Sequence, residues 1–201
     1  MEISKRRLIL PVFDPIFKGQ LLRLAPPTAD DQAIFAAWAQ DEDYMRMLDD
    51  DPIRPESPLN YASFADAPDD KSYYFHLRTL ADDTLVGFVV LFNLKWGNQS
   101  AEMAIGIGDP SNRGKGYGQD ALKLILNYGF NELNLHRISL TVMEYNAPAI
   151  KAYERVGFVQ EGAHRQAVQR QGKRYDLLLY GILRDEFWQR LNKVSKEDDF
   201  S

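Results

Sequence analysis

The sequence has no cysteine. This absence excludes disulfide bonds, thiolate metal ligands and a cysteine nucleophile. The composition therefore suits a reducing compartment, and we expect a cytoplasmic protein that needs no covalent cross-link. With 45% hydrophobic and 12% aromatic residues, the 201-residue chain can bury a substantial core of its own.

Long hydrophobic runs are also missing. The apolar stretch at residues 8–13 is followed by Asp14 and Pro15, and it is too short for the hydrophobic region of a signal peptide. No later run approaches the length of a membrane span. We therefore expect a soluble protein with no membrane partner.

An excess of positive charge is likewise absent, because the formal net charge is −5. Attraction of the whole molecule to a nucleic acid is therefore not expected. Acidic residues instead gather at residues 41–51. Two interpretations stay open: a solvated surface, which is the usual fate of a charge run, or a negative funnel for a cationic amine.

Hydrophobic periodicity predicts one mixed α/β domain. Strands are expected at 20–24, 73–80, 85–96, 101–107, 137–143, 158–161 and 173–183. Helices are expected at 29–40, 41–48, 58–65, 118–133, 147–156 and 184–191. The order β-αα-βββ-α-β-α-β-β predicts a single domain at 18–191, between an N-terminal extension at 1–17 and a disordered tail at 192–201.

The first of these helices carries two more specific expectations. Thr28 is placed to cap it, with Asp31 at the acidic position of a capping box. Ile34, Phe35 and Trp38 recur at helical spacing, so we expect all three in the hydrophobic core.

A basic, glycine-rich segment leads into the helix at 118–133. Gly114, Gly116 and Gly118 lack a β-carbon, so the backbone can come close to a ligand. The start of the following helix favours an anion, and Arg113 and Lys115 add positive charge. The segment predicts a phosphate-binding loop, with a glycine-rich turn that binds nothing as the alternative.

The spacing of this segment distinguishes three phosphate-binding patterns. A Walker loop requires Ser or Thr after Gly-Lys, and here Gly116 follows Gly114-Lys115. A dinucleotide fingerprint requires Gly-x-Gly-x-x-Gly in a parallel βαβ unit, and here Gly-x-Gly-x-Gly follows an antiparallel meander. Arg-x-x-Gly-x-Gly is satisfied once, by Arg113, Gly116 and Gly118.

This third pattern resembles the first of two signatures of the GNAT acetyltransferase superfamily. The second signature, Asn…Ala…Tyr…Gly-Phe, is matched in the same order by the block from Asn146 through Tyr153 to Gly157 and Phe158. The resemblance covers the segment from about Leu22 to Phe187. It implies the single-domain acyl-CoA N-acyltransferase fold, a mixed α/β structure around a mostly antiparallel central sheet.

The resemblance also implies acetyl-CoA as cosubstrate and no metal. Backbone amides of the loop would bind the pyrophosphate, and the Ile107 amide, on a bulged strand at 105–107, would face the developing oxyanion. The residues expected to bind the cofactor are Ile105, Ile107, Arg113, Gly114, Lys115, Gly116, Tyr117, Gly118, Gln119, Asn146, Ala149 and Tyr153.

Side chains for the remaining chemistry follow from the same comparison and from residue type. Tyr153 stands where related enzymes place a tyrosine near the CoA sulfur, so it is the candidate acid; a packed tyrosine with a locally bonded hydroxyl is the alternative. Glu102 is the candidate base, acting through a water; an exposed strand residue or the structural partner of an arginine is the alternative. Asn146 fits both a cofactor ligand and a helix N-cap. His76 fits both a core and a surface position.

The residues specify the donor of the reaction better than its acceptor. No metal site and no Ser-His-Asp arrangement is recognised in the sequence, which favours direct transfer in a ternary complex. We expect an N-acetyltransferase for a primary amine. Because residues 162–179 resemble the ribosomal-protein and spermidine acetyltransferases, a protein N-terminus ranks above a polyamine, and an aminoglycoside is also compatible.

Two other classes of protein stay open. One is a non-catalytic acyl-CoA sensor on the same scaffold, and the other is a nucleotide-binding protein, which the spacing disfavours. A homodimer, through the edge of the sheet or through the strand at 177–180, is a further hypothesis.

Overall fold

A twisted sheet runs through the computed structural model, which describes residues 15–65 and 72–198. Within those residues the sheet has seven strands in the order β1-β2-β3-β4-β5-β7-β6. The strands are β1 (Leu22–Ala25), β2 (Tyr73–Thr79), β3 (Leu85–Lys95), β4 (Ser100–Ile107), β5 (Arg137–Met143), β6 (Val159–Arg170) and β7 (Lys173–Leu183). Every neighbouring pair is antiparallel except β4 and β5. The predicted mixed α/β fold with a mostly antiparallel sheet is confirmed.

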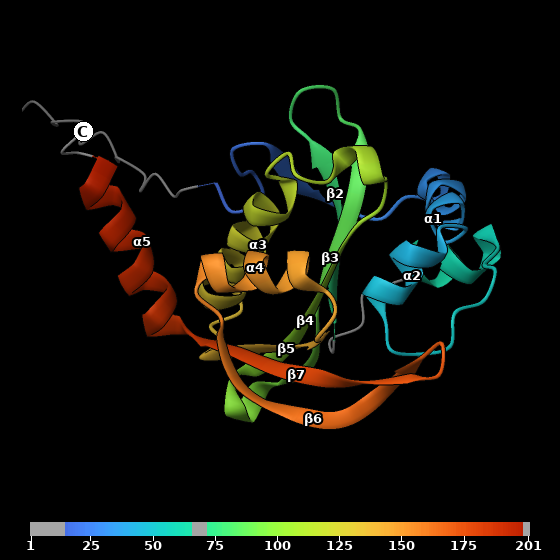
Figure 1. The fold of residues 1–201 in the computed structure, drawn as a ribbon. Helices are drawn as coiled ribbons and strands as arrows, with labels where there is room; N and C mark the ends of the chain where they lie inside the picture. Colours follow the sequence, from blue (N-terminus) through green and yellow to red (C-terminus); the bar gives the residue numbers. More distant parts are fainter. Residues whose placement is uncertain (1–14, 66–71, 199–201) are drawn as a thin grey trace, which may run out of the picture.

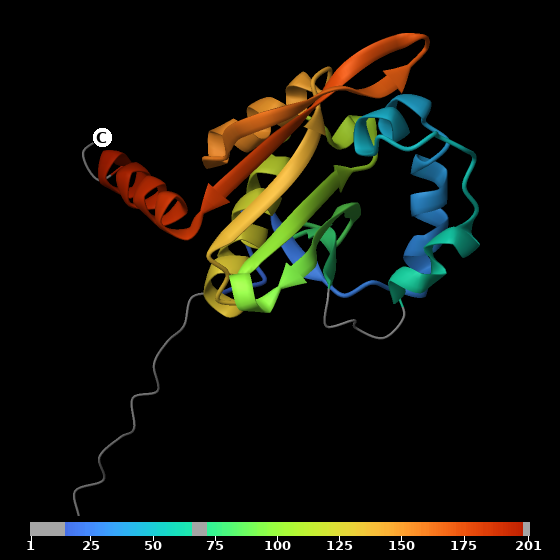
Figure 2. The same ribbon diagram turned by 90° about the horizontal axis from the view of Figure 1, so that it is seen from below.

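Helices flank the sheet on different sides (Figure 1). They are α1 (Gln32–Trp38), α2 (Glu42–Leu48), α3 (Tyr117–Asn127), α4 (Ala147–Val156) and α5 (Arg184–Asp198), with a 3₁₀ helix at Pro58–Ala65. Helix α3 packs on β1, β3, β4 and α4. Figures 1 and 2 both place α1 and α2 on the side of the molecule opposite to α5.

The hydrophobic core lies between the sheet and the α3–α4 pair. Leu122, Ile125 and Leu126 recur on one face of α3 and are almost fully buried, as are Leu91 on β3 and Ile138 on β5. Helix α4 ends at Gly157, whose φ of 110° is in the left-handed region that suits glycine after a helix. These local signals explain why the element order was predictable.

The region around α1 departs from the prediction. Residues 29–31 form a 3₁₀ turn, and the α-helix covers only Gln32–Trp38. Thr28 makes no side-chain bond to the backbone of that turn; its hydroxyl donates to Asp31 instead, at 2.8 Å. The capping-box expectation was therefore wrong. Phe35 is buried, but Ile34 is 40% exposed, so Ile34 is not a core residue.

Two other elements are longer than expected. Strand β6 extends from Val159 to Arg170, whereas a short strand at 158–161 was expected. Helix α5 continues to Asp198, past the expected end at 191 and into the segment expected as a disordered tail. The domain boundaries at 18 and 191 stay predictions, and most of the expected N-terminal extension lies outside the described residues.

A buried carboxylate on α3 fixes the start of the sheet. Asp120 is 7% exposed and accepts hydrogen bonds from the backbone amides of Gln20, Leu21 and Leu22, at 3.0, 2.8 and 2.8 Å. A β-carbon at Gly19 would lie 2.5 Å from a carboxylate oxygen, so only glycine lets the chain pass this close. Asp120 thus attaches β1 to the helix that follows the glycine-rich loop.

We predict that Asp120→Asn lowers the free energy of unfolding by about 3 kcal/mol, because three backbone amides lose a charged acceptor that is itself buried. Chemical denaturation of the purified protein measures this. The control is Glu144→Gln, at an exposed carboxylate, which should change stability by no more than about 0.5 kcal/mol. Equal effects of the two substitutions would contradict the anchoring role.

Candidate active site

The site is built where two parallel strands part. Strands β4 and β5 pair only at Ser100–Arg137, Ala101–Ile138 and Glu102–Ser139. Beyond Glu102, β4 stays paired with β3 as far as Ile107, and β5 stays paired with β7 as far as Met143. A gap therefore opens between β4 and β5, towards α2 in Figure 2.

The backbone of β4 presents hydrogen-bonding groups to this gap. The Gly108 amide donates to the Val86 carbonyl at 3.0 Å, so the backbone groups of Gly108 and Gly106 point towards β3. Because these groups alternate along a strand, those of Ile105 and Ile107 point the other way, into the gap. This orientation is what the predicted role of the Ile107 amide requires.

The expected bulge at 105–107 is not found. The pairing of β3 with β4 is continuous from Gly87–Ile107 to Phe92–Glu102, and its one irregularity lies further on, between Phe92 and Lys95. The free amides come from the divergence of β5, so an unbulged β4 suffices. Gly106 still serves close packing: a β-carbon there would lie 2.6 Å from Phe88 and 2.7 Å from the Tyr44 hydroxyl oxygen.

The glycine-rich loop lies at one end of the gap and leads into α3. Gly114 and Gly116 have φ values of 76° and 89°, and Gly116 is the N-cap residue of α3. Both conformations favour glycine. At Gly118, in the first turn of α3, a β-carbon would meet nothing within 4 Å. The loop therefore leaves open space at the positive end of a helix, as an anion site requires.

Some side chains of the loop make structural contacts. The Arg113 guanidinium donates to the Gly108 carbonyl at 3.0 Å, lies 3.7 Å from the Asp41 carboxylate and lies 5.7 Å from the centre of the Tyr44 ring. Gln119 donates to the Ala152 carbonyl at 2.8 Å and joins α3 to α4. Arg113 thus connects the loop to α2, a function that the sequence pattern did not indicate.

Helix α4 forms the wall of the gap on the β5 side. The Asn146 side chain accepts a hydrogen bond from the Ala149 amide at 3.3 Å, so it is the N-cap of α4, and its nitrogen donates to the Met47 carbonyl at 3.0 Å. Tyr153 is 7% exposed, and burial raises the pKa of its phenol to about 12. Its hydroxyl is therefore protonated at neutral pH, as an acid must be.

These elements enclose one cavity of about 580 Å³. It brings together most of the predicted site, namely Glu102, Ile105, Ile107, Arg113, Gly114, Gly118, Asn146, Ala149 and Tyr153. Lys115, Gly116, Tyr117 and Gln119 belong to the loop and the first turn of α3 but do not line the cavity. Glu102 is partly buried and accepts a hydrogen bond from Asn93 at 3.1 Å.

The opposite wall is α2 and the residues after it, which belong to the acidic segment at 41–51 that one of the two interpretations takes as a negative funnel for an amine. Tyr44, Met47, Leu48, Asp49 and Asp50 line the cavity from this side. Three side chains donate hydrogen bonds to backbone carbonyl groups of this wall. Tyr145 donates to Arg46 at 2.8 Å, Asn146 donates to Met47, and Arg170, on β6, donates to Asp49 and Asp51 at 2.9 and 3.1 Å.

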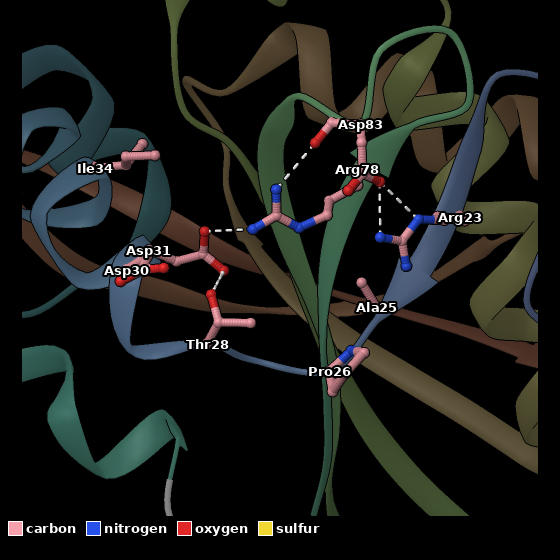
Figure 3. A pocket seen from close by; sticks show the side chains of 9 residues that line it. All are labelled: Arg23, Ala25, Pro26, Thr28, Asp30, Asp31, Ile34, Arg78 and Asp83. Atoms are coloured by element: carbon pink, nitrogen blue, oxygen red, sulfur yellow. Dashed lines mark hydrogen bonds and ion pairs between the residues drawn. The ribbon is translucent and has the colours of Figure 1, made fainter.

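A second cavity of similar volume lies beside β1 and α1 (Figure 3). Its two arginines are already paired: Arg23 with the Asp83 carboxylate at 2.7 Å, and Arg78 with Asp31 and the Asp83 carbonyl. Asp31 also accepts a hydrogen bond from Thr28. The cations of this cavity are therefore not free to bind an anion, in contrast to the glycine-rich loop.

Behind that cavity, Asp31 bonds His76 Nδ1 at 2.6 Å, and both side chains are 3% exposed. His76 is therefore a core histidine. Burial lowers its pKa from the ordinary 6.5, and the Asp31 carboxylate offsets only part of this effect. For Asp31, burial alone would raise the pKa, but hydrogen bonds from Thr28, His76 and Arg78 bring it below the ordinary 3.8.

Comparisons with known proteins agree with this geometry. The family described as acetyltransferase (GNAT) domain matches residues 22–159. A prophage-derived uncharacterized N-acetyltransferase of Bacillus subtilis (strain 168) is 27% identical over 169 residues, which are 84% of this chain and 93% of that protein. The spermidine N(1)-acetyltransferase of Vibrio cholerae is 34% identical over 110 residues, 55% of this chain and 63% of that protein.

A solved structure is similar over most of its length. The spermidine N-acetyltransferase from Vibrio cholerae, in complex with CoA and spermine, superposes with a TM-score of 0.74 at 27% identity. The match covers 83% of this chain and 98% of that one. Within residues 15–65 and 72–198, no cluster of potential metal ligands is found, and no helix is long and apolar enough to cross a membrane.

The Asp31–His76 pair predicts a pH-dependent stability. Both folded pKa values lie below the unfolded ones, so the unfolded chain binds more protons as the pH falls. The contribution of this pair to the free energy of unfolding should be fully present above about pH 6.5. It should fall below that pH as the histidine of the unfolded chain is protonated, and fall again below about pH 4. Denaturation at about pH 7.5 and about pH 5.5 should show the first loss, and His76→Gln should reduce it.

The control for this measurement is His164→Gln, because His164 is exposed. It should keep the wild-type difference between the two pH values. A wild-type free energy of unfolding that is the same at both values would contradict the buried, neutral state of His76.

Proposed function

The chain belongs to the acetyltransferase (GNAT) domain family, and we propose that it binds acetyl-CoA in the gap between β4 and β5 and acetylates a primary amine. The observation that carries the proposal is the orientation of Ile105 and Ile107, whose backbone groups face the gap beside a glycine-rich helix start. An extended, amide-bearing chain such as pantetheine can pair with such an edge, and the helix start can hold its pyrophosphate.

The residues of the gap fit this cosubstrate. Acetyl-CoA supplies a thioester, whose carbon is the electrophile. In the proposal the Ile107 amide donates to the thioester oxygen, where negative charge develops. The loop amides at 114–118 hold the diphosphate, and the open space at Gly118 leaves room for it. Asn146 and Ala149, at the start of α4, line the same cavity.

Two side chains are proposed to handle protons. Tyr153 donates a hydrogen bond and then a proton to the departing sulfur. With a phenol pKa of about 12 against about 8.5 for a typical thiol, complete transfer is uphill, so the hydrogen bond precedes it. Glu102 removes the proton of the amine through a water.

The acceptor that we propose is a polyamine. Three acidic residues line the cavity, Asp49, Asp50 and Glu102, and a ligand with several ammonium groups can pair with more than one of them. The similarity to spermidine N-acetyltransferase supports the same choice. This reverses the ranking made from the tail of the sequence, which placed a protein N-terminus first.

The test is thiol release from acetyl-CoA with a panel of polyamines, N-terminal peptides, aminoglycosides and amino acids. We expect turnover with spermidine or spermine at the lowest KM. Tyr153→Phe should lower kcat by about a hundredfold or more and change the CoA affinity little. Faster turnover of a peptide would show that the acceptor is a protein N-terminus and not a polyamine. CoA binding with no turnover of any amine would indicate a sensor.

Gly118→Val should abolish acetyl-CoA binding without unfolding the protein. Gly118 is helical, and its new side chain would enter the open space of the cavity, so the free protein should keep its melting temperature. We expect a loss of affinity of at least about a hundredfold by calorimetry. Gly116→Val is less specific, because φ of 89° and Leu21 at 3.3 Å also strain the fold.

Unchanged affinity in Gly118→Val would contradict the placement of the diphosphate. Loss of affinity together with a lowered melting temperature would show that the loop itself had been damaged.

A further inference from the structure

Tyr44, on α2, has a hydroxyl that the fold itself does not use. The residue is 6% exposed, and its hydroxyl oxygen is shielded from solvent and bonds no group among the described residues. Buried polar groups almost always have a partner, so an exception in a cavity wall points to a ligand. Burial also raises the pKa of this phenol, which is therefore neutral and able to accept and donate a hydrogen bond.

The hydroxyl lies on the face of β4 away from the core. A β-carbon on Gly106 would lie 2.7 Å from it, which places the oxygen directly against that glycine. The neighbouring side chains of Ile105 and Ile107 pack towards the hydrophobic core instead. Gly106 thus separates the Tyr44 hydroxyl from the core side of β4, next to the Ile107 amide that would hold the thioester.

The position of Tyr44 is fixed by contacts at its helix end. Asp41 accepts hydrogen bonds from the Asp43 and Tyr44 amides at 3.0 and 3.2 Å and so caps α2. The Arg113 guanidinium lies over the Tyr44 ring and near Asp41. A side chain fixed in advance loses little conformational freedom when it binds a ligand.

On the basis of the proposed acetyl transfer, we infer that the Tyr44 hydroxyl accepts a hydrogen bond from the acceptor amine and holds its nitrogen beside Gly106 for attack on the thioester. A neutral phenol suits this role better than a carboxylate, because a carboxylate would stabilise the unreactive ammonium form. As the C–N bond forms, the C–S bond breaks. The amine loses its proton towards Glu102, and Tyr44 keeps its own.

The experiment compares Tyr44→Phe with the wild type in steady-state kinetics with spermidine. We expect kcat/KM for the amine to fall about tenfold or more. The CoA affinity should stay unchanged, because Tyr44 acts on the acceptor alone. The melting temperature should be equal or higher, since no structural hydrogen bond is removed.

The matched control is Tyr128→Phe, at another buried tyrosine that does not line the cavity. It should keep the wild-type kcat/KM. An unchanged kcat/KM in Tyr44→Phe would overturn the inference, and so would an equal loss of CoA affinity or a lowered melting temperature. If the wild type acetylates no amine at all, the proposed function itself fails, which is a different result.

Discussion

The parting of β4 from β5 is the constraint on which the site depends. Both strands keep their outer partners, β3 and β7, along the whole diverging stretch. Among the residues that the structure describes, the pairing between β4 and β5 ends there, and the backbone groups at Ile105 and Ile107 have no partner strand on that side. Such groups are costly to bury without a hydrogen bond, so the gap favours a ligand that supplies one.

The other parts of the site meet around this gap. The helix start at Gly116–Gly118 is the proposed anion site at one end, and Tyr153 comes from α4 on the β5 side. Helix α2 closes the third side and is held at both ends, by Arg113 near its start and by Tyr145, Asn146 and Arg170 near its finish. Arg113 and Asn146 each belong to a cofactor signature and also contact the wall where the acceptor is proposed to bind. The donor and acceptor halves of the site are therefore mechanically connected.

What the sequence predicted well was local. The strand–loop–helix order, the glycine after α4 and the N-cap at Asn146 follow from neighbouring residues, and the two signatures lie in continuous segments. What it missed depends on residues far apart in the chain. The local pattern predicts Asp31 as a capping acid, yet its partners His76 and Arg78 lie on β2. Asp120 and Tyr44 carried no recognisable pattern, because their contacts at Gln20–Leu22 and Gly106 form only in the folded chain. The prediction of a bulge was wrong for the same reason, because the free backbone groups come from strand divergence, which is a property of the whole sheet.

The central claim is that the amides of Ile105 and Ile107 receive the acyl donor. Amide hydrogen exchange followed by NMR, with and without acetyl-CoA, tests it most directly. The account predicts strong new protection at Ile105 and Ile107. It predicts little change at Gly106, whose backbone already pairs with β3. Unchanged exchange at Ile105 and Ile107 in the presence of saturating acetyl-CoA would contradict it.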